Sequence, residues 1–168
     1  WRRVTPTSFN FGNCKRFWNR MIEFRLTVDR RIIQAILPKL EESFSLLGQQ
    51  TLNSFACPNP LDDDFSQAWE DGLKEENREN RSALARLFKR PRFRHGYVQV
   101  KEDETENILR GLSELRLLVR DKYLGEITDY ELENGEFNLD GKSSNVKIGY
   151  FIYVLLAQIQ ENLISFCL

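Results

Sequence analysis

Cysteine and histidine are scarce in this chain of 168 residues, which has three cysteines and a single histidine. The cysteines, Cys14, Cys57 and Cys167, are odd in number, lie far apart and form no CxxC pair. That pattern argues against a disulfide framework and against a zinc site. We therefore expect reduced thiols, no bound metal and a cytoplasmic location.

Recognised catalytic motifs are also missing. The sequence contains no GxSxG, P-loop, HExxH or GxGxxG pattern. His95 lies in an arginine-rich turn with no fixed partner in sequence, whereas a general base needs an orienting group and a pocket. We predict no catalytic residues and no cofactor, which favours a non-catalytic protein.

No excess of charge and no long apolar run is present. The chain has 24 basic and 25 acidic residues and a net charge of −1, which argues against a dedicated nucleic-acid binder. Positions 150–157 are all apolar, but a bilayer span needs about 20 predominantly apolar residues. Gln158, Gln160 and Glu161 end this run early, so no membrane contact is expected.

The last stretch, Gly149 to Leu168, is the most hydrophobic part of the chain. A helix that is apolar on all sides must be buried in a core or in a membrane. We predict that this stretch forms the central core helix, buried at its start and amphipathic toward its end.

Two strand-then-helix units precede it. Residues 21–28 alternate between apolar and polar, which is typical of a half-buried strand, and Asp29 then suits the N-cap of a helix that reaches Gly48. Pro38 inside this helix predicts a kink or a break. Residues 97–100 form a second short strand, and we expect the two strands to pair.

Cap signals mark two further helices. Asp62 and the two aspartates after it suit a helix N-terminus, and Thr128 with Glu131 fits a capping box. The predicted fold is mainly α, with about four principal helices around a buried C-terminal helix and a small two-stranded β element. Residues 1–20 are expected to form a basic, aromatic N-terminal arm, and residues 21–168 a single helical domain. The chain opens on Trp1 rather than on Met, so the natural start is expected upstream.

Basic residues gather in the arm and in the turn at 89–95. A nucleic-acid interpretation would use them to contact phosphates, and it needs them to converge on one face. The alternative is a solvated loop at a helix C-terminus, where cations are favoured. The residues concerned are Arg2, Arg3, Lys15 and Arg16 in the arm and Lys89, Arg90, Arg92, Arg94 and His95 in the turn.

Arg116 is predicted to lie on the apolar face of its helix. An arginine there either extends its guanidinium to water or meets a carboxylate, for which Glu76 is the first candidate and Glu161 the second. One interpretation is a buried, hydrogen-bonded strut. The other is an anion- or peptide-binding pocket that Arg116 lines together with Asn80 and Glu76.

Three stretches resemble an uncharacterised bacterial family, known mostly from actinobacteria and called domain of unknown function twenty-seventeen. They are FRLTVDRRIIQAILPKL from Phe24, the pair of segments at 65–88 and 98–127, and the terminal helix with Gln160-Glu161-Asn162-Leu163. LSELRLLVRDKYLGEI, which includes Arg116, is the most specific of these motifs. The chain is poorer in Ala and richer in Asn, Lys and Phe than the family and has a basic turn, so it resembles a distant member. The resemblance implies a helical domain without an assigned activity.

Two functions remain open. The first is a non-catalytic protein-interaction or regulatory domain, whose partner is another protein or a second copy in a homodimer. The second is a nucleic-acid-binding protein that uses the basic arm and the turn at 89–95.

Overall fold

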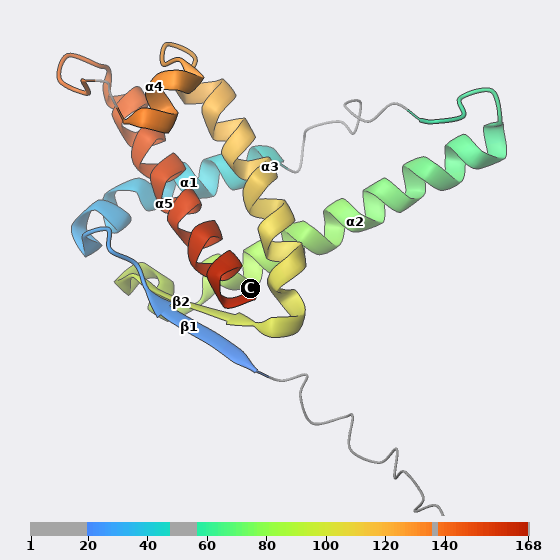
Figure 1. Cartoon of the computed structure of the whole chain (residues 1–168), viewed down its shortest axis with the longest axis horizontal. Helices are drawn as coiled ribbons and strands as arrows, with labels where there is room; N and C mark the ends of the chain where they lie inside the picture. Colours follow the sequence, from blue (N-terminus) through green and yellow to red (C-terminus); the bar gives the residue numbers. More distant parts are fainter. Residues whose placement is uncertain (1–19, 48–56, 136–137, 168) are drawn as a thin grey trace, which may run out of the picture.

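The structure of the chain is a computed structural model, and it describes residues 20–47, 57–135 and 138–167, without the side chains of Glu133 and Cys167. This part of the chain is mainly α-helical, with five α-helices and a two-stranded antiparallel sheet (Figure 1), which confirms the predicted fold class. Apart from Arg20, the predicted arm lies outside the described residues. The elements are, in chain order, β1 (Met21–Arg25), α1 (Arg30–Leu47), α2 (Asp63–Lys89), the 3-10 helix η1 (Pro91–His95), β2 (Tyr97–Lys101), the 3-10 helix η2 (Glu102–Glu104), α3 (Thr105–Tyr123), α4 (Asp129–Asn134) and α5 (Ser144–Cys167).

Strands β1 and β2 pair with each other, as predicted. Ile22 lies opposite Val100 in the antiparallel register, and both side chains are buried in the core. The first strand is shorter than the predicted 21–28, because the chain turns toward α1 after β1. Leu26 closes this turn by donating its backbone N–H to the carbonyl of Gly96 at 2.8 Å.

Helix α1 begins as predicted and continues through its proline. The Asp29 side chain caps it by accepting a hydrogen bond from the backbone N–H of Arg31 at 2.7 Å. The predicted interruption at Pro38 is wrong in so far as the helix does not break there. Pro38 and Gln34, the residue whose carbonyl loses its helical donor, are both exposed, so water can satisfy that carbonyl. The opposite face is held in the core by Ile33, Ile36, Leu40, Ser43 and Leu47.

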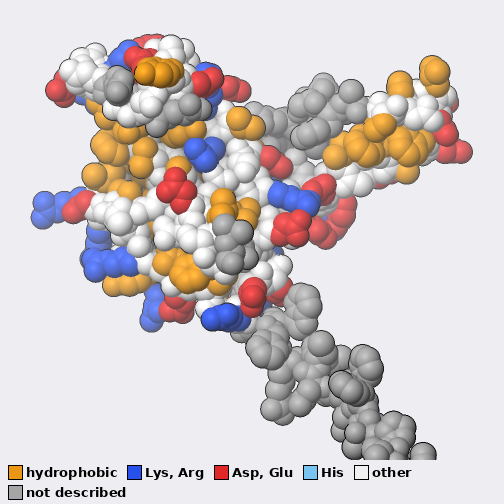
Figure 2. Space-filling model, in the orientation of Figure 1, with side chains coloured by type: hydrophobic (Ala, Val, Ile, Leu, Met, Phe, Trp, Pro, Cys, Tyr) orange, Lys and Arg blue, Asp and Glu red, His pale blue; other side chains and the backbone are white. Residues whose placement is uncertain are grey.

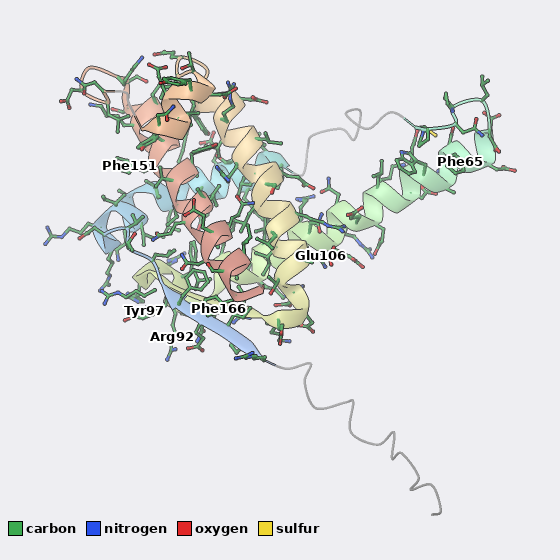
Figure 3. All side chains as sticks on the ribbon, in the orientation of Figure 1. Phe65, Arg92, Tyr97, Glu106, Phe151 and Phe166 are labelled. Carbon is green, nitrogen blue, oxygen red and sulfur yellow. The ribbon has the colours of Figure 1, made fainter. Side chains whose placement is uncertain are left out.

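Helix α2 has one packed half and one projecting half. The predicted start is confirmed, because Asp62 accepts a hydrogen bond from the backbone N–H of Phe65 at 3.0 Å. The second half packs against α3 and buries Asn80, Ala83, Leu84 and Leu87. The first half extends away from the other helices, with Phe65 near its far end (Figures 1 and 3). Figure 2 shows hydrophobic side chains along this projecting half, where Phe65 stacks on Trp69.

The basic turn at 89–95 is ordered by a buried aromatic residue. Its central part is η1, whose Phe93 is fully buried against Phe88 of α2. Gly96 ends η1 with a φ of 81°, a conformation that favours glycine. The cations of the turn are therefore held on a short structured segment between α2 and β2.

Helix α5 packs against α3 and α1 and supplies a large part of the core. It begins at Ser144, ahead of the stretch from Gly149 that was predicted to form the core helix. Its fully buried side chains are Ile152, Leu155, Leu156, Ile159 and Leu163. The expectation that 150–157 is buried on all sides is met only in part, because five of these eight residues keep some of their surface exposed. The partly exposed residues of this run are Tyr150, Phe151, Tyr153, Val154 and Ala157.

Candidate functional site

Arg116 of α3 points toward α5 and is held there by two side chains. Its Nη1 donates to Oε1 of Gln160 at 2.7 Å, and its guanidinium carbon lies 4.4 Å from the ring centroid of Tyr153. Gln160 is only 8 % exposed and is itself fixed, because its Nε2 donates to Oγ of Ser113 at 2.8 Å. The Nε of Arg116 is buried and has no hydrogen-bond partner among the described residues. Arg116 is thus held by a hydrogen bond and a cation–π contact rather than by an ion pair.

The structure separates Arg116 from two of the three residues that were predicted to share its site. Glu76 forms an ion pair with Arg110, which precedes Arg116 on α3, so its proposed pairing with Arg116 is wrong. Asn80 is buried in the α2–α3 interface, next to Glu114. Glu161 alone lines the same pocket as Arg116. A helical wheel places a residue on a face, but it does not say which neighbouring helix covers that face.

The pocket at Arg116 lies between α3, α5, α4 and the turn before α1. It has a volume of about 470 Å³, within the usual range for small-molecule sites. Among the described residues, Arg116 and Glu161 are the only charged ones that line it, and no ion pair joins these two. The other lining residues are Thr27, Val28, Leu132, Tyr150, Tyr153, Val154, Ala157 and Gln158.

A second polar cluster lies between α2 and α3. Burial raises the pKa of the Glu114 carboxyl above its usual range, although a hydrogen bond from the Asn80 amide and the charge of Arg81 oppose this shift. Asn80 is 2 % exposed, and its Oδ1 has no partner within the part of the chain that the structure describes. The cluster belongs to the interface between α2 and α3.

A further cavity is a groove between α1, the end of α2 and η1, which we call the α1–α2 groove. Its volume is about 600 Å³. Its apolar surface comes from Leu37, Leu40 and Phe44 of α1 and from Ala85 and Phe88 of α2. The remaining lining residues are Glu41, Ser45, Lys89, Pro91, Arg94 and His95.

The cations of the basic turn do not all point to this groove. Lys89, Arg94 and His95 line it, and Nη2 of Arg94 lies 3.7 Å from the carboxylate of Glu41. Arg90 instead points toward the start of β1 and of α3. Its Nη1 donates to Sδ of Met21 at 3.6 Å, and its Nη2 lies 3.9 Å from the carboxylate of Glu104. Arg92 is exposed near the two strands, on the same side of the molecule as Tyr97 (Figure 3).

Residues 20–47, 57–135 and 138–167 contain no group of three or more His, Cys, Asp or Glu side chains that could hold a metal ion. In the same ranges, no helix is both long enough and apolar enough to cross a bilayer. Cys57 is a free thiol, whereas Cys14 and the side chain of Cys167 lie outside the described residues.

Comparison with known proteins finds no match among family models, curated proteins or solved structures. The resemblance to domain of unknown function twenty-seventeen therefore stays a prediction. The functional assignment of the chain rests on its own cavities and side chains.

Sequence reasoning missed the residues that complete both cavities. Tyr153 and Gln160 were assigned to a buried helix and to its polar end, and nothing in their spacing indicates that they hold Arg116. Leu37, Phe44 and Phe88, which line the α1–α2 groove, are only partly buried. A signal existed for the groove, because a basic turn directly follows the apolar stripe of α2.

Proposed function

We propose that the chain is a non-catalytic protein-interaction domain. Its α1–α2 groove binds an apolar segment of a partner protein that also carries acidic side chains. The observation that supports this proposal is the combination, in one cavity, of partly exposed apolar residues from two helices with the cations Lys89 and Arg94.

The shape of the groove suits a helix or an extended peptide. Leu37 and Phe44 lie about two helical turns apart on α1, and Phe88 of α2 lines the same groove. The rings of Phe88 and Phe44 pack edge to face, with their centroids 5.9 Å apart. Such a groove accepts apolar side chains that recur every three to four residues on a partner helix. Burial of these side chains supplies the affinity, since the apolar groove residues are not yet fully covered.

The charges at the groove favour an acidic partner. Lys89 is exposed, and the pair between Arg94 and Glu41 is also exposed, with both side chains 65 % accessible. An exposed ion pair at 3.7 Å contributes little to stability, so a carboxylate of the partner can replace Glu41 at low cost. Complementary charge would fix the orientation of the partner and speed its association.

Nucleic-acid binding through the same turn has less support. Phosphate-backbone binding depends on several cations that release counterions together. Arg90 and Arg94 each have a carboxylate nearby, and they point in different directions. The arginines and lysine of the predicted arm lie outside the described residues.

Selection from a displayed random-peptide library tests the proposal. We expect the enriched peptides to combine apolar residues at helical spacing with Asp or Glu. Charge reversal by Lys89→Glu with Arg94→Glu should weaken their binding by at least about tenfold, and the residual affinity should lose most of its dependence on salt.

A matched pair of tryptophan variants separates the groove from the rest of α2. Ala85→Trp places a bulky ring in the groove, whereas Ala68→Trp places the same ring on the exposed face of the projecting half. Ala85→Trp should abolish binding of the enriched peptides and Ala68→Trp should leave it unchanged. Enrichment of basic peptides, or equal effects of the two variants, would refute the proposed function.

A further inference from the structure

We propose that the pocket at Arg116 is a binding site for a small zwitterion of the amino-acid class, with an apolar side chain. This site is separate from the α1–α2 groove, because it is built from α3, α4, α5 and the turn before α1. The inference therefore does not depend on the proposed function.

Arg116 is ordered before any ligand arrives. The ring of Tyr153 supports its flat face, and Gln160 holds one edge through Nη1. Gln160 is in turn fixed by Ser113 and by the backbone carbonyl of Leu109, to which Nε2 donates at 3.3 Å. A group held in this way loses little conformational freedom on binding, which favours affinity.

Part of the guanidinium remains available for a carboxylate. Among the described residues, Nη2 of Arg116 makes no hydrogen bond and no carboxylate lies within ion-pair distance of the side chain. A guanidinium edge matches the geometry of a carboxylate and forms short, charge-assisted hydrogen bonds with it. The carboxylate of the ligand would occupy this edge.

Glu161 determines that the ligand must also carry a positive charge. It is exposed, lines the same pocket and forms no ion pair in the part of the chain that the structure describes. One cation and one anion thus face the same cavity without neutralising each other. A molecule with a carboxylate and an ammonium group satisfies both, whereas a phosphate dianion would be repelled by Glu161.

The remaining lining residues select an apolar side chain. Val28, Leu132, Val154 and Ala157 contribute aliphatic surface, and the ring of Tyr153 contributes an aromatic wall. At about 470 Å³ the cavity has room for a whole amino acid rather than for a single ion. Thr27 and Gln158 add polar atoms to the same lining, and polar groups beside apolar surface are usual in a small-molecule site.

Isothermal titration calorimetry with defined probes tests this site. The probes are L-leucine, L-methionine and L-phenylalanine, together with N-acetyl-L-leucine, which lacks the ammonium group, and L-leucinamide, which lacks the carboxylate. We expect saturable binding of at least one free amino acid, and binding of the two leucine derivatives to be weaker by about tenfold or more.

Three variants link the binding to the two charged residues. Arg116→Gln should weaken binding of the free amino acid by at least about tenfold, and Arg110→Gln on the same helix should leave it unchanged. Glu161→Gln should weaken the binding of the free amino acid but not the binding of N-acetyl-L-leucine, because the acetylated probe has no ammonium group for Glu161 to bind. Far-UV circular dichroism of each variant shows that loss of binding is not loss of folding.

Two results would overturn the inference. The first is the absence of saturable binding for all three free amino acids up to about 10 mM, a concentration above the dissociation constant of even a weak specific site. The second is binding that Arg116→Gln and Arg110→Gln leave equally strong, since an Arg116 that acts only as a structural strut predicts this result.

Discussion

At the scale of single residues, Glu42 links α1 to α3 through ion pairs with two lysines. Its carboxylate lies 2.8 Å from Nζ of Lys39 and 2.9 Å from Nζ of Lys122. Both ammonium groups also lie over the ring of Tyr123, at 5.3 and 5.2 Å from its centroid. Hydrogen bonds from the two lysines lower the pKa of Glu42 from 4.5 to about 2.

This pKa predicts a specific pH dependence of stability. A carboxyl whose pKa is lower in the folded than in the unfolded chain stabilises the fold above its unfolded pKa, and the contribution is lost as the pH falls through the folded pKa. Glu42→Gln should therefore lower the free energy of unfolding at pH 7, and its difference from wild type should shrink between pH 4.5 and about 2. Urea unfolding at a series of pH values measures this difference.

The control for Glu42 is Glu79→Gln, at an exposed residue of α2 that forms no ion pair among the described residues. This variant should differ little from wild type at any pH. A deficit of Glu42→Gln that stays constant down to pH 2 would show that the carboxylate charge is not its cause.

The sequence predicted on which face of its helix a residue lies, but it did not predict which residue of a neighbouring helix that side chain contacts. Arg116 was correctly expected on an inward face, because residues three and four positions apart share a side of a helix. Its partner was wrongly expected to be Glu76, which pairs with Arg110 instead. Helical periodicity does not give the angle at which α3 crosses α2 and α5, and that angle decides which residues meet.

At the scale of elements, cap signals and periodicity were reliable. The capping box at Thr128 and Glu131 is present, with both reciprocal hydrogen bonds, and Asp62 caps α2 as predicted. The two short strands pair as predicted. Two expectations differ from the structure. Helix α1 does not break at Pro38, and part of the apolar run in α5 stays partly exposed.

Close approach of α5 to α3 depends on Gly149. A Cβ atom at this position would overlap Cβ of Tyr123. Gly149→Ala should therefore destabilise the fold by about 1–3 kcal/mol, the usual cost of overpacking. Equilibrium unfolding in urea measures the change.

Gly72 of α2 provides the matched control for Gly149. No atom lies within 4 Å of a Cβ added there, and the residue is in a helix. Gly72→Ala should stabilise the chain by up to about 1 kcal/mol, because alanine loses less entropy in a helix than glycine does. If both substitutions stabilise the protein, α5 and α3 are not in close contact at Gly149.

At the scale of the whole molecule, both cavities arise where segments distant in sequence meet. The α1–α2 groove joins residues 37–45 to residues 85–95, and the Arg116 pocket joins residues 27 and 28 to residues 116, 132 and 150–161. Composition and periodicity predicted the helices that form these cavities. They could not predict the cavities, because partial exposure of Leu37, Phe44 or Tyr153 depends on how the helices pack around one another.

Site-specific photo-crosslinking in the native cells shows whether the α1–α2 groove holds a partner protein. A photoreactive amino acid replaces Ser45, which lines the groove, or Gln34, an exposed residue elsewhere on α1. We predict a discrete adduct from position 45 and none from position 34. The adduct should disappear in the Lys89→Glu, Arg94→Glu background, and its crosslinked peptide should be apolar with Asp or Glu nearby. Adducts from both positions, or an adduct that survives the charge reversal, would contradict the account.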